Sequence, residues 1–186
     1  MRKRKIKKEE IWSIPNCMGY FRILLIPVFC MVYLNADSVK DYYLAAGIVL
    51  VSTITDLFDG KVARKFNMVT ELGKFVDPFA DKLTHGAVAL CLCTRYKPMV
   101  WLVALMAIKE GFMAVMGLIN LRRGKKLDGA KWYGKICTAT LFVVLGILVL
   151  IPEISKKIAD GLIFGEMVIM AVVLVLYAFE FRKMAQ

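Results

Sequence analysis

Apolar residues occupy long stretches of the chain, and short polar links separate these stretches. Residues 17–34 contain one charged side chain, Arg22, residues 136–152 contain none, and residues 161–179 contain only Glu166. A helix that spans a bilayer needs roughly 20 predominantly apolar residues. The pattern therefore predicts six transmembrane helices, over residues 15–35, 39–66, 72–94, 98–121, 132–152 and 159–181.

The composition favours an integral membrane protein over a soluble domain. Of the 186 residues, 59% are hydrophobic, and the mean hydropathy is +0.62, whereas soluble domains are about half apolar. A soluble fold would have to bury several whole helices inside a small chain. We expect an all-α, polytopic membrane protein that forms a single domain over residues 1–186, because no linker, repeat or low-complexity segment divides it.

The start of the chain, MRKRKIKKEE, carries six Lys/Arg and two Glu residues. A signal peptide also begins with positive charge, but residues 13–16 interrupt the transition and no small-residue cleavage site follows. We therefore expect residues 1–13 to be retained as a basic interfacial segment on anionic lipid head groups, ahead of a six-helix bundle over residues 14–186. The net charge of +11 then indicates membrane lipids, and no nucleic acid partner is expected.

Lysine and arginine are unevenly distributed between the polar links. With the N-terminus inside, 18 of them lie on the inner side and five lie in the outer links. Cytoplasmic loops of membrane proteins carry the excess of positive charge. We expect a multi-pass protein of the cell (inner) membrane, with both termini and the charged stretch of residues 56–82 on the cytoplasmic side.

Two pairs of aspartates stand out in this charged stretch. Asp56 and Asp59 are three residues apart, and Asp77 and Asp81 are four residues apart. Residues at these spacings share one face of a helix. Because a short link joins the two helices, the four carboxylates are expected to converge near the cytoplasmic edge of the membrane.

Four converging carboxylates require compensating charge, because uncompensated charges resist desolvation. Two divalent cations would supply it, and carboxylate oxygen is a ligand that Mg²⁺, Mn²⁺ and Ca²⁺ prefer. A pair of metal ions is also the arrangement that supports phosphoryl transfer. The alternative is ion pairing at the helix ends, of Asp56 with Lys61 or of Asp77 with Lys74.

The acidic pairs belong to a longer pattern of eight residues at fixed spacing. It reads Asp56-x2-Asp59-Gly60-x2-Ala63-Arg64-x8-Gly73-x3-Asp77-x3-Asp81. This pattern resembles the defining motif of the CDP-alcohol phosphotransferase (CDP-alcohol phosphatidyltransferase class I) family at every position. The six-helix hydropathy pattern is similar to that of the family over the whole chain.

The resemblance implies the roles of the motif residues. Asp56, Asp59 and Asp77 would bind two divalent cations, Mg²⁺ or Mn²⁺, and Asp81 would complete the metal site and act as general base on the incoming hydroxyl. The implied site for the cytidine diphosphate group consists of Asp56, Gly60, Ala63, Arg64 and Gly73. A glycine permits close approach of a ligand or backbone, and an arginine fork suits a diphosphate.

Within the family, the chain most resembles the phosphatidylglycerophosphate synthase branch, in residues 14–29, 67–84 and 133–140. This branch transfers the phosphatidyl group of CDP-diacylglycerol to glycerol 3-phosphate and releases CMP. Cardiolipin synthases of the same family share the Ile-Pro-Asn start and the core motif, and accept phosphatidylglycerol. They remain an alternative, as do family members with other alcohol acceptors such as inositol phosphate or serine.

Basic residues near the site would have to hold the phosphate of the acceptor. Lys135, at the inner start of the fifth predicted helix, is the better candidate. Lys109 lies in an apolar stretch, where a charge is costly and indicates a function or a partner. Its alternative role is an ion pair with Glu110 or across helices; because neighbouring residues do not share a helix face, the sequence favours the phosphate role.

Several positions differ from the branch pattern or extend it. Lys109 precedes Glu110 where the branch has Arg-Glu, no arginine follows two turns later, and Cys137 stands where the branch has lysine. His85, four residues after Asp81, is a candidate to hydrogen-bond the base or a ligand carboxylate, although packing is the commoner role of a lone histidine.

Two other classes of function are compatible with charge in a membrane protein. An intramembrane cation transporter also uses carboxylates, but they would be spread through the membrane depth, whereas these aspartates cluster on two helix ends. A basic membrane adaptor gives no reason for the spacing of the motif. The enzyme interpretation is therefore favoured, and the resemblance further suggests a homodimer.

Overall fold

The computed structural model describes residues 12–66, 70, 72–122 and 131–185. Inside its helices, the side chains of residues 57, 60, 62–64, 74, 75, 121, 184 and 185 are not described. Most of the basic segment over residues 1–13 lies outside the described residues. The prediction for that segment therefore stays a prediction.

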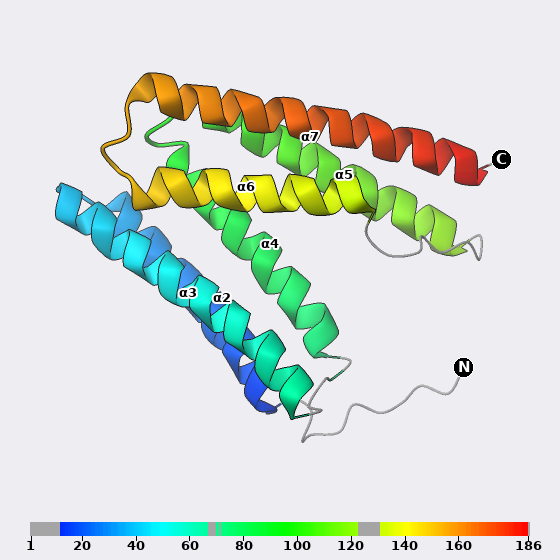
Figure 1. Ribbon diagram of the computed structural model, residues 1–186, viewed down its shortest axis with the longest axis horizontal. Helices are drawn as coiled ribbons and strands as arrows, with labels where there is room; N and C mark the ends of the chain where they lie inside the picture. The colour runs from blue at the N-terminus through cyan, green and yellow to red at the C-terminus, as the bar shows by residue number, and fades with distance from the viewer. Residues whose placement is uncertain (1–11, 67–69, 71, 123–130, 186) are drawn as a thin grey trace. The chain divides into compact units, whose positions relative to one another are not determined.

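The described part of the chain is all-α, as predicted (Figure 1). Its helices agree with the predicted ranges to within four residues at either end. They are α2 (Ile14–Leu34), α3 (Val39–Lys65), α4 (Gly73–Leu92), α5 (Met99–Arg122), α6 (Trp132–Leu150) and α7 (Lys156–Ala185).

Four of the described helices are long and apolar enough to cross a membrane. These spans have mean hydropathies between 1.9 and 2.5 and cover Ile14–Leu34, Met99–Asn120, Trp132–Leu150 and Lys156–Lys183. Helices α3 and α4 are not among the spans found in the described residues, and each of them carries part of the charged motif. The structure thus supports a multi-pass membrane protein, and six crossings remain a prediction.

Local hydrogen bonds explain several helix ends. Asp41 in the first turn of α3 accepts hydrogen bonds from the backbone N–H groups of Asp37 and Ser38, at 3.2 and 2.9 Å, which satisfies donors that a helix start leaves free. The start of α7 precedes the predicted one because the Ser155 carbonyl accepts from the N–H groups of Ile158 and Ala159, at 3.0 Å each.

The chain divides into two compact units, Met1–Cys91 and Leu92–Gln186. In the first unit, α2 and α3 run antiparallel and pack along each other, and α4 then starts from the end at which α3 finishes (Figure 1). The end of α3 and the start of α4 are the segments that carry the charged motif.

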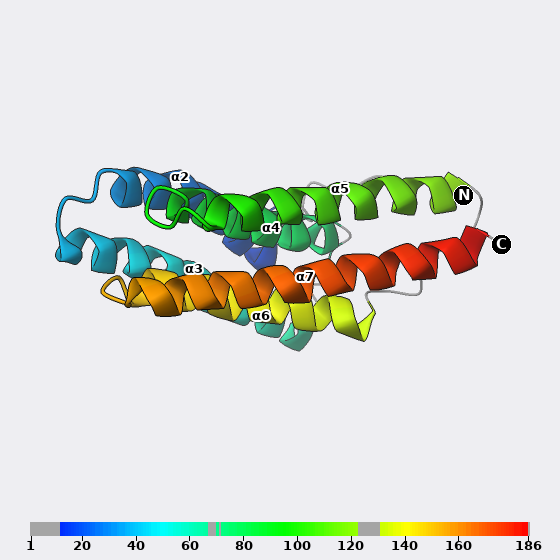
Figure 2. The same cartoon turned by 90° about the horizontal axis from the view of Figure 1, so that it is seen from above.

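In the second unit, α7 packs against both α5 and α6 (Figures 1 and 2). Its buried side chains include Met170, Tyr177 and Phe181. The ring of Phe181 meets the ring of Phe112 from α5 edge-on, with centroids 5.8 Å apart. The Tyr177 ring meets Tyr133 of α6 in the same way, at 4.8 Å, so aromatic contacts join α7 to both neighbouring helices.

Candidate active site

The four motif aspartates converge around one guanidinium group, that of Arg22 on α2. Arg22 is only 2% exposed, and it forms ion pairs with all four carboxylates. Its partners are Asp56 and Asp59 from α3, and Asp77 and Asp81 from α4. The predicted convergence of the two acidic pairs is therefore observed, with a cation at its centre.

Each terminal nitrogen of Arg22 joins one carboxylate of α3 to one of α4. Nη1 donates to Oδ1 of Asp56 and to Oδ1 of Asp81, the latter at 2.6 Å. Nη2 lies 3.0 Å from Oδ2 of Asp59 and 3.6 Å from Oδ1 of Asp77. The fork thus links the end of α3 to the start of α4 twice.

The carboxylates are accessible although the arginine is not. The side chains of Asp56, Asp77 and Asp81 are 41–45% exposed, and only Asp59 is buried, with 5% of its side chain exposed. Among these five side chains, four negative charges face one positive charge. The site therefore presents an excess of negative charge to the solvent.

The donor set fits divalent cations in its chemistry. Carboxylate oxygens are hard ligands of the kind that Mg²⁺ and Mn²⁺ take, and the uncompensated charge of the cluster favours cations. Among the side chains that the structure describes, no three acidic, His or Cys groups converge on one point as metal ligands. Cation binding would require the carboxylates to turn toward the ion.

The buried Asn16 of the Ile-Pro-Asn segment positions the start of α4. The Thr70 hydroxyl donates to Asn16 Oδ1 at 3.1 Å and accepts from the backbone N–H of Gly73 at 2.9 Å. A Cβ atom on Gly73 would lie 2.7 Å from Asn16 Oδ1. Close packing therefore requires glycine at position 73, in addition to any role in the predicted nucleotide pocket.

A second glycine lets α2 approach α4 next to the cluster. A Cβ atom on Gly19 would lie 3.0 Å from Cγ1 of Val76 and 3.5 Å from Oδ1 of Asp77. Gly19 lies one helical turn from both Asn16 and Arg22, so these three residues form one stripe along α2. This stripe faces the start of α4 and the acidic cluster.

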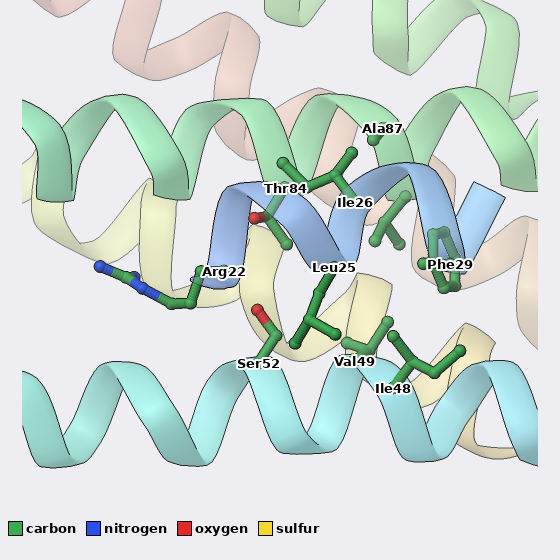
Figure 3. A pocket seen from close by; sticks show the side chains of 10 residues that line it. Arg22, Leu25, Ile26, Phe29, Ile48, Val49, Ser52, Thr84 and Ala87 are labelled. Atoms are coloured by element: carbon green, nitrogen blue, oxygen red, sulfur yellow. The ribbon is translucent and has the colours of Figure 1, made fainter. Parts of the chain in front are cut away.

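On the other side of Arg22 lies a small apolar pocket between α2, α3 and α4. Figure 3 shows the Arg22 side chain extending away from the apolar side chains of Leu25, Ile26 and Phe29. The hydroxyl-bearing residues Ser52 and Thr84 also line this pocket. The charged end of Arg22 is thus directed out of an apolar floor toward the carboxylates.

The remaining predicted site residues of the first unit are only partly described. His85 on α4 lies close enough to Asp56 for an electrostatic interaction, which is compatible with its predicted place beside the carboxylates. Gly60, Ala63 and Arg64 lie on α3, but their side chains are outside the described residues. Their part in nucleotide binding remains a prediction.

The two predicted phosphate-binding lysines belong to the second unit. Lys135 is exposed in the first turn of α6. Lys109 is buried on α5, 8% exposed, and its Nζ lies 2.9 Å from Oε1 of Glu110. The expectation that these neighbouring residues would not pair is wrong, because both side chains are long enough to meet beside the helix.

Sequence reasoning missed two buried charged residues. Each of them, Arg22 and Glu166, is the lone charge of an apolar stretch, and the sequence alone does not indicate the partner of either. Glu166 on α7 is 1% exposed, interacts electrostatically with Lys109, and has its Oε1 3.9 Å from Sγ of Cys137. The high cost of an isolated charge at membrane depth was the signal available for both residues.

Comparisons with known proteins extend over nearly the whole chain. A family model described as CDP-alcohol phosphatidyltransferase matches residues 12–179. A Mycobacterium tuberculosis (strain H37Rv) protein named probable phosphatidylglycerophosphate synthase is 30% identical over 168 residues, which cover 89% of this chain and 79% of the relative. The CDP-diacylglycerol–glycerol-3-phosphate 3-phosphatidyltransferase of Escherichia coli (strain K12) is 32% identical over 157 residues, which cover 82% and 85%.

Proposed function

The chain belongs to the CDP-alcohol phosphatidyltransferase family, and from this premise we propose that it transfers the phosphatidyl group of CDP-diacylglycerol to glycerol 3-phosphate. The products are CMP and phosphatidylglycerophosphate. The names of the Mycobacterium tuberculosis and Escherichia coli relatives support this choice of acceptor. The observation that carries the proposal is the convergence of four aspartates from α3 and α4 at one half-exposed site.

Asp56, Asp59, Asp77 and Asp81 would hold two divalent cations, Mg²⁺ or Mn²⁺. When bound, these cations neutralise the diphosphate and stabilise the negative charge on the departing CMP. The half-exposed side chains of Asp56, Asp77 and Asp81 are accessible for this role. Asp59 would contribute from the buried side of the cluster.

The other residues of the motif bind and orient the donor. Arg64 would pair with the diphosphate, for which a guanidinium fork is suited. Gly60 and Ala63 would leave room for the cytidine group beside α3, with Asp56 at its edge, and Gly73 would border the group from the start of α4. Such binding holds the phosphorus that carries diacylglycerol in position for attack by the acceptor.

Asp81 would act as general base. It accepts the proton of the acceptor hydroxyl as the hydroxyl oxygen forms a bond to that phosphorus, and the bond between the phosphorus and the oxygen of CMP breaks. Asp81 suits this role because 45% of its side chain is exposed while its Oδ1 is fixed by Arg22 at 2.6 Å. His85 would support the cluster through Asp56.

Lys135 would bind the phosphate of the acceptor, since its side chain is exposed to solvent. Lys109 would contribute less, because Glu110 already compensates its charge. The excess of Lys and Arg on one side of the predicted membrane topology supports a cytoplasmic site and cytoplasmic termini in the cell membrane. A homodimer is proposed from the family resemblance alone.

Release of CMP by the purified protein tests the function. The protein in phosphatidylglycerol-free micelles is given CDP-diacylglycerol and Mg²⁺ or Mn²⁺, and then glycerol 3-phosphate, phosphatidylglycerol, serine or inositol phosphate in separate reactions. We expect CMP release and a phosphatidylglycerophosphate product, identified by lipid mass spectrometry, with glycerol 3-phosphate.

The other outcomes separate the alternatives. A product formed only with phosphatidylglycerol would identify a cardiolipin synthase, and a product only with serine or inositol phosphate another branch of the family. If no acceptor released CMP, the transferase proposal would be wrong. Divalent cation flux into proteoliposomes without CMP release would instead favour a transporter.

A further inference from the structure

We propose that Arg22 is a positioning residue that fixes the four carboxylates from the buried side of the site. In this arrangement the guanidinium holds the carboxylates of α3 next to those of α4, at the place where divalent cations would bind. The inference rests on the proposed function and adds a residue from α2 to a site whose motif lies on α3 and α4.

The distribution of the contacts supports this role. Arg22 contacts all four aspartates, through Oδ1 of Asp56, Oδ2 of Asp59, Oδ1 of Asp77 and Oδ1 of Asp81. Contacts of this kind limit how far each carboxylate has to turn in order to meet a cation.

The exposed fractions of the side chains also indicate that Arg22 and the solvent lie on opposite sides of the carboxylates. Arg22 is 2% exposed, whereas the side chains of Asp56, Asp77 and Asp81 are 41–45% exposed. In Asp77, the oxygen that faces Arg22 is itself buried, so the exposure of that side chain comes from its other atoms. The arginine thus holds the carboxylates from the floor of the site, and solvent reaches them from the opposite side.

The bridging geometry requires a guanidinium group. Nη1 joins Asp56 to Asp81, and Nη2 joins Asp59 to Asp77. An ammonium group carries the same charge on a single nitrogen, so it has no fixed fork with which to hold two pairs at once. Lysine at position 22 would therefore supply the charge without the orientation.

The charge of Arg22 also reduces repulsion within the cluster before cations bind. Three negative charges still remain among these five side chains, which is enough to attract divalent cations. A buried charge is costly unless it is paired, and Arg22 lies above an apolar pocket lined by residues such as Leu25 and Phe29. The carboxylates and the arginine therefore depend on each other for stability.

Direct binding of Mn²⁺ to Arg22→Gln and Arg22→Lys tests the proposal. The purified full-length chain in micelles is titrated with Mn²⁺ alone, and free Mn²⁺ is measured by electron paramagnetic resonance. We expect the Kd of Arg22→Gln to rise about tenfold to hundredfold, the range for loss of a group that orients metal ligands. Arg22→Lys should stay closer to Arg22→Gln than to the unmodified protein, and it carries the test if Arg22→Gln does not fold.

Phe29→Ala is the matched control for packing, because Phe29 is a buried residue of the same helix, 3% exposed, that makes no contribution of charge. This variant should lower the thermal midpoint of the metal-free protein and leave the Kd for Mn²⁺ unchanged. An equal loss of Mn²⁺ affinity in Phe29→Ala would overturn the proposal, because the effect would then come from helix packing.

Two further results would overturn the inference. Unchanged or tighter Mn²⁺ binding in Arg22→Gln would mean that the arginine is a bystander or a competitor of the cations. Full recovery in Arg22→Lys would mean that only its charge matters. The unmodified protein distinguishes these failures from failure of the proposed function: if it binds Mn²⁺ and releases CMP while Arg22→Gln binds equally well, only the role of Arg22 is wrong.

Discussion

Among the described residues, each compact unit buries one cation in an apolar helix, Arg22 in the first and Lys109 in the second, and the two cations have different surroundings. Arg22 in the first unit faces four carboxylates, three of which are 41–45% exposed. Lys109 in the second unit pairs with Glu110 and interacts with Glu166, which is 1% exposed. One cluster has excess charge open to solvent, and the other is largely closed.

This difference indicates that the cluster around Arg22 is a functional site and that the cluster around Lys109 is a structural ion pair. An accessible excess of carboxylates attracts cations and charged ligands, whereas a buried cation between helices mainly joins them. The chemistry is therefore expected to depend on the first cluster, and the stability of the second unit on the second cluster. Substitutions that change charge but little volume test this distinction.

Asp77→Asn should have the largest effect, because it removes a predicted metal ligand from the open cluster. Loss of a residue that only orients ligands costs about tenfold to hundredfold in activity, so we expect CMP release to fall by more than about hundredfold. Membrane insertion should be unchanged. Asp37→Asn, on the exposed link before α3, is the control and should retain normal turnover; near-normal turnover in Asp77→Asn would contradict the metal assignment.

Lys109→Met should destabilise the second unit. Removing one partner of a buried pair leaves uncompensated charge and costs about 3 kcal/mol or more. The free energy of unfolding, measured by SDS titration in mixed micelles, should recover in part in the double variant Lys109→Met/Glu166→Gln, which also removes the buried carboxylate.

Lys156→Met is the control for Lys109→Met, because Lys156 is exposed at the start of α7. It should change the free energy of unfolding by less than about 0.5 kcal/mol. If the effects of Lys109→Met and Glu166→Gln on the free energy of unfolding simply added in the double variant, Lys109 and Glu166 would not interact.

Gly73→Ala should lower the free energy of unfolding by less than Lys109→Met does, because it disturbs packing but leaves no charge unpaired. The new methyl group would lie 2.7 Å from Asn16 Oδ1, and overpacking of this kind costs about 1–2 kcal/mol, in the lower part of its usual range. Gly86→Ala on the same helix is the control, since nothing lies within 4 Å of its Cβ position. It should be neutral or stabilising, and equal effects of both substitutions would refute the packing role of Gly73.

The helices and the pairing of the aspartates were predictable because both depend on local periodicity. Apolar runs determine the helices, and spacings of three and four residues determine which side chains share a face. The early start of α7 was not predicted, because backbone hydrogen bonds to Ser155 extend the helix over polar residues.

The contacts that complete the site were not predictable from periodicity. Arg22 is separated from Asp56 by 34 residues and from Asp81 by 59, and Thr70 is separated from Asn16 by 54. Only the packing of α2 against α3 and the start of α4 brings these residues together. The failure at Lys109 has a different cause, since the helical face rule describes Cβ positions and not the reach of long side chains.

Lys135→Ala should have the smallest effect, because it removes one exposed charge outside both clusters. An exposed ion pair contributes up to about 1 kcal/mol, so the KM for glycerol 3-phosphate should rise by about fivefold at most, while the KM for CDP-diacylglycerol stays unchanged. Lys157→Ala, an equally exposed position in the first turn of α7, is the control. A change in the donor KM alone would assign Lys135 to the nucleotide instead, and would show that the acceptor phosphate is bound by other residues.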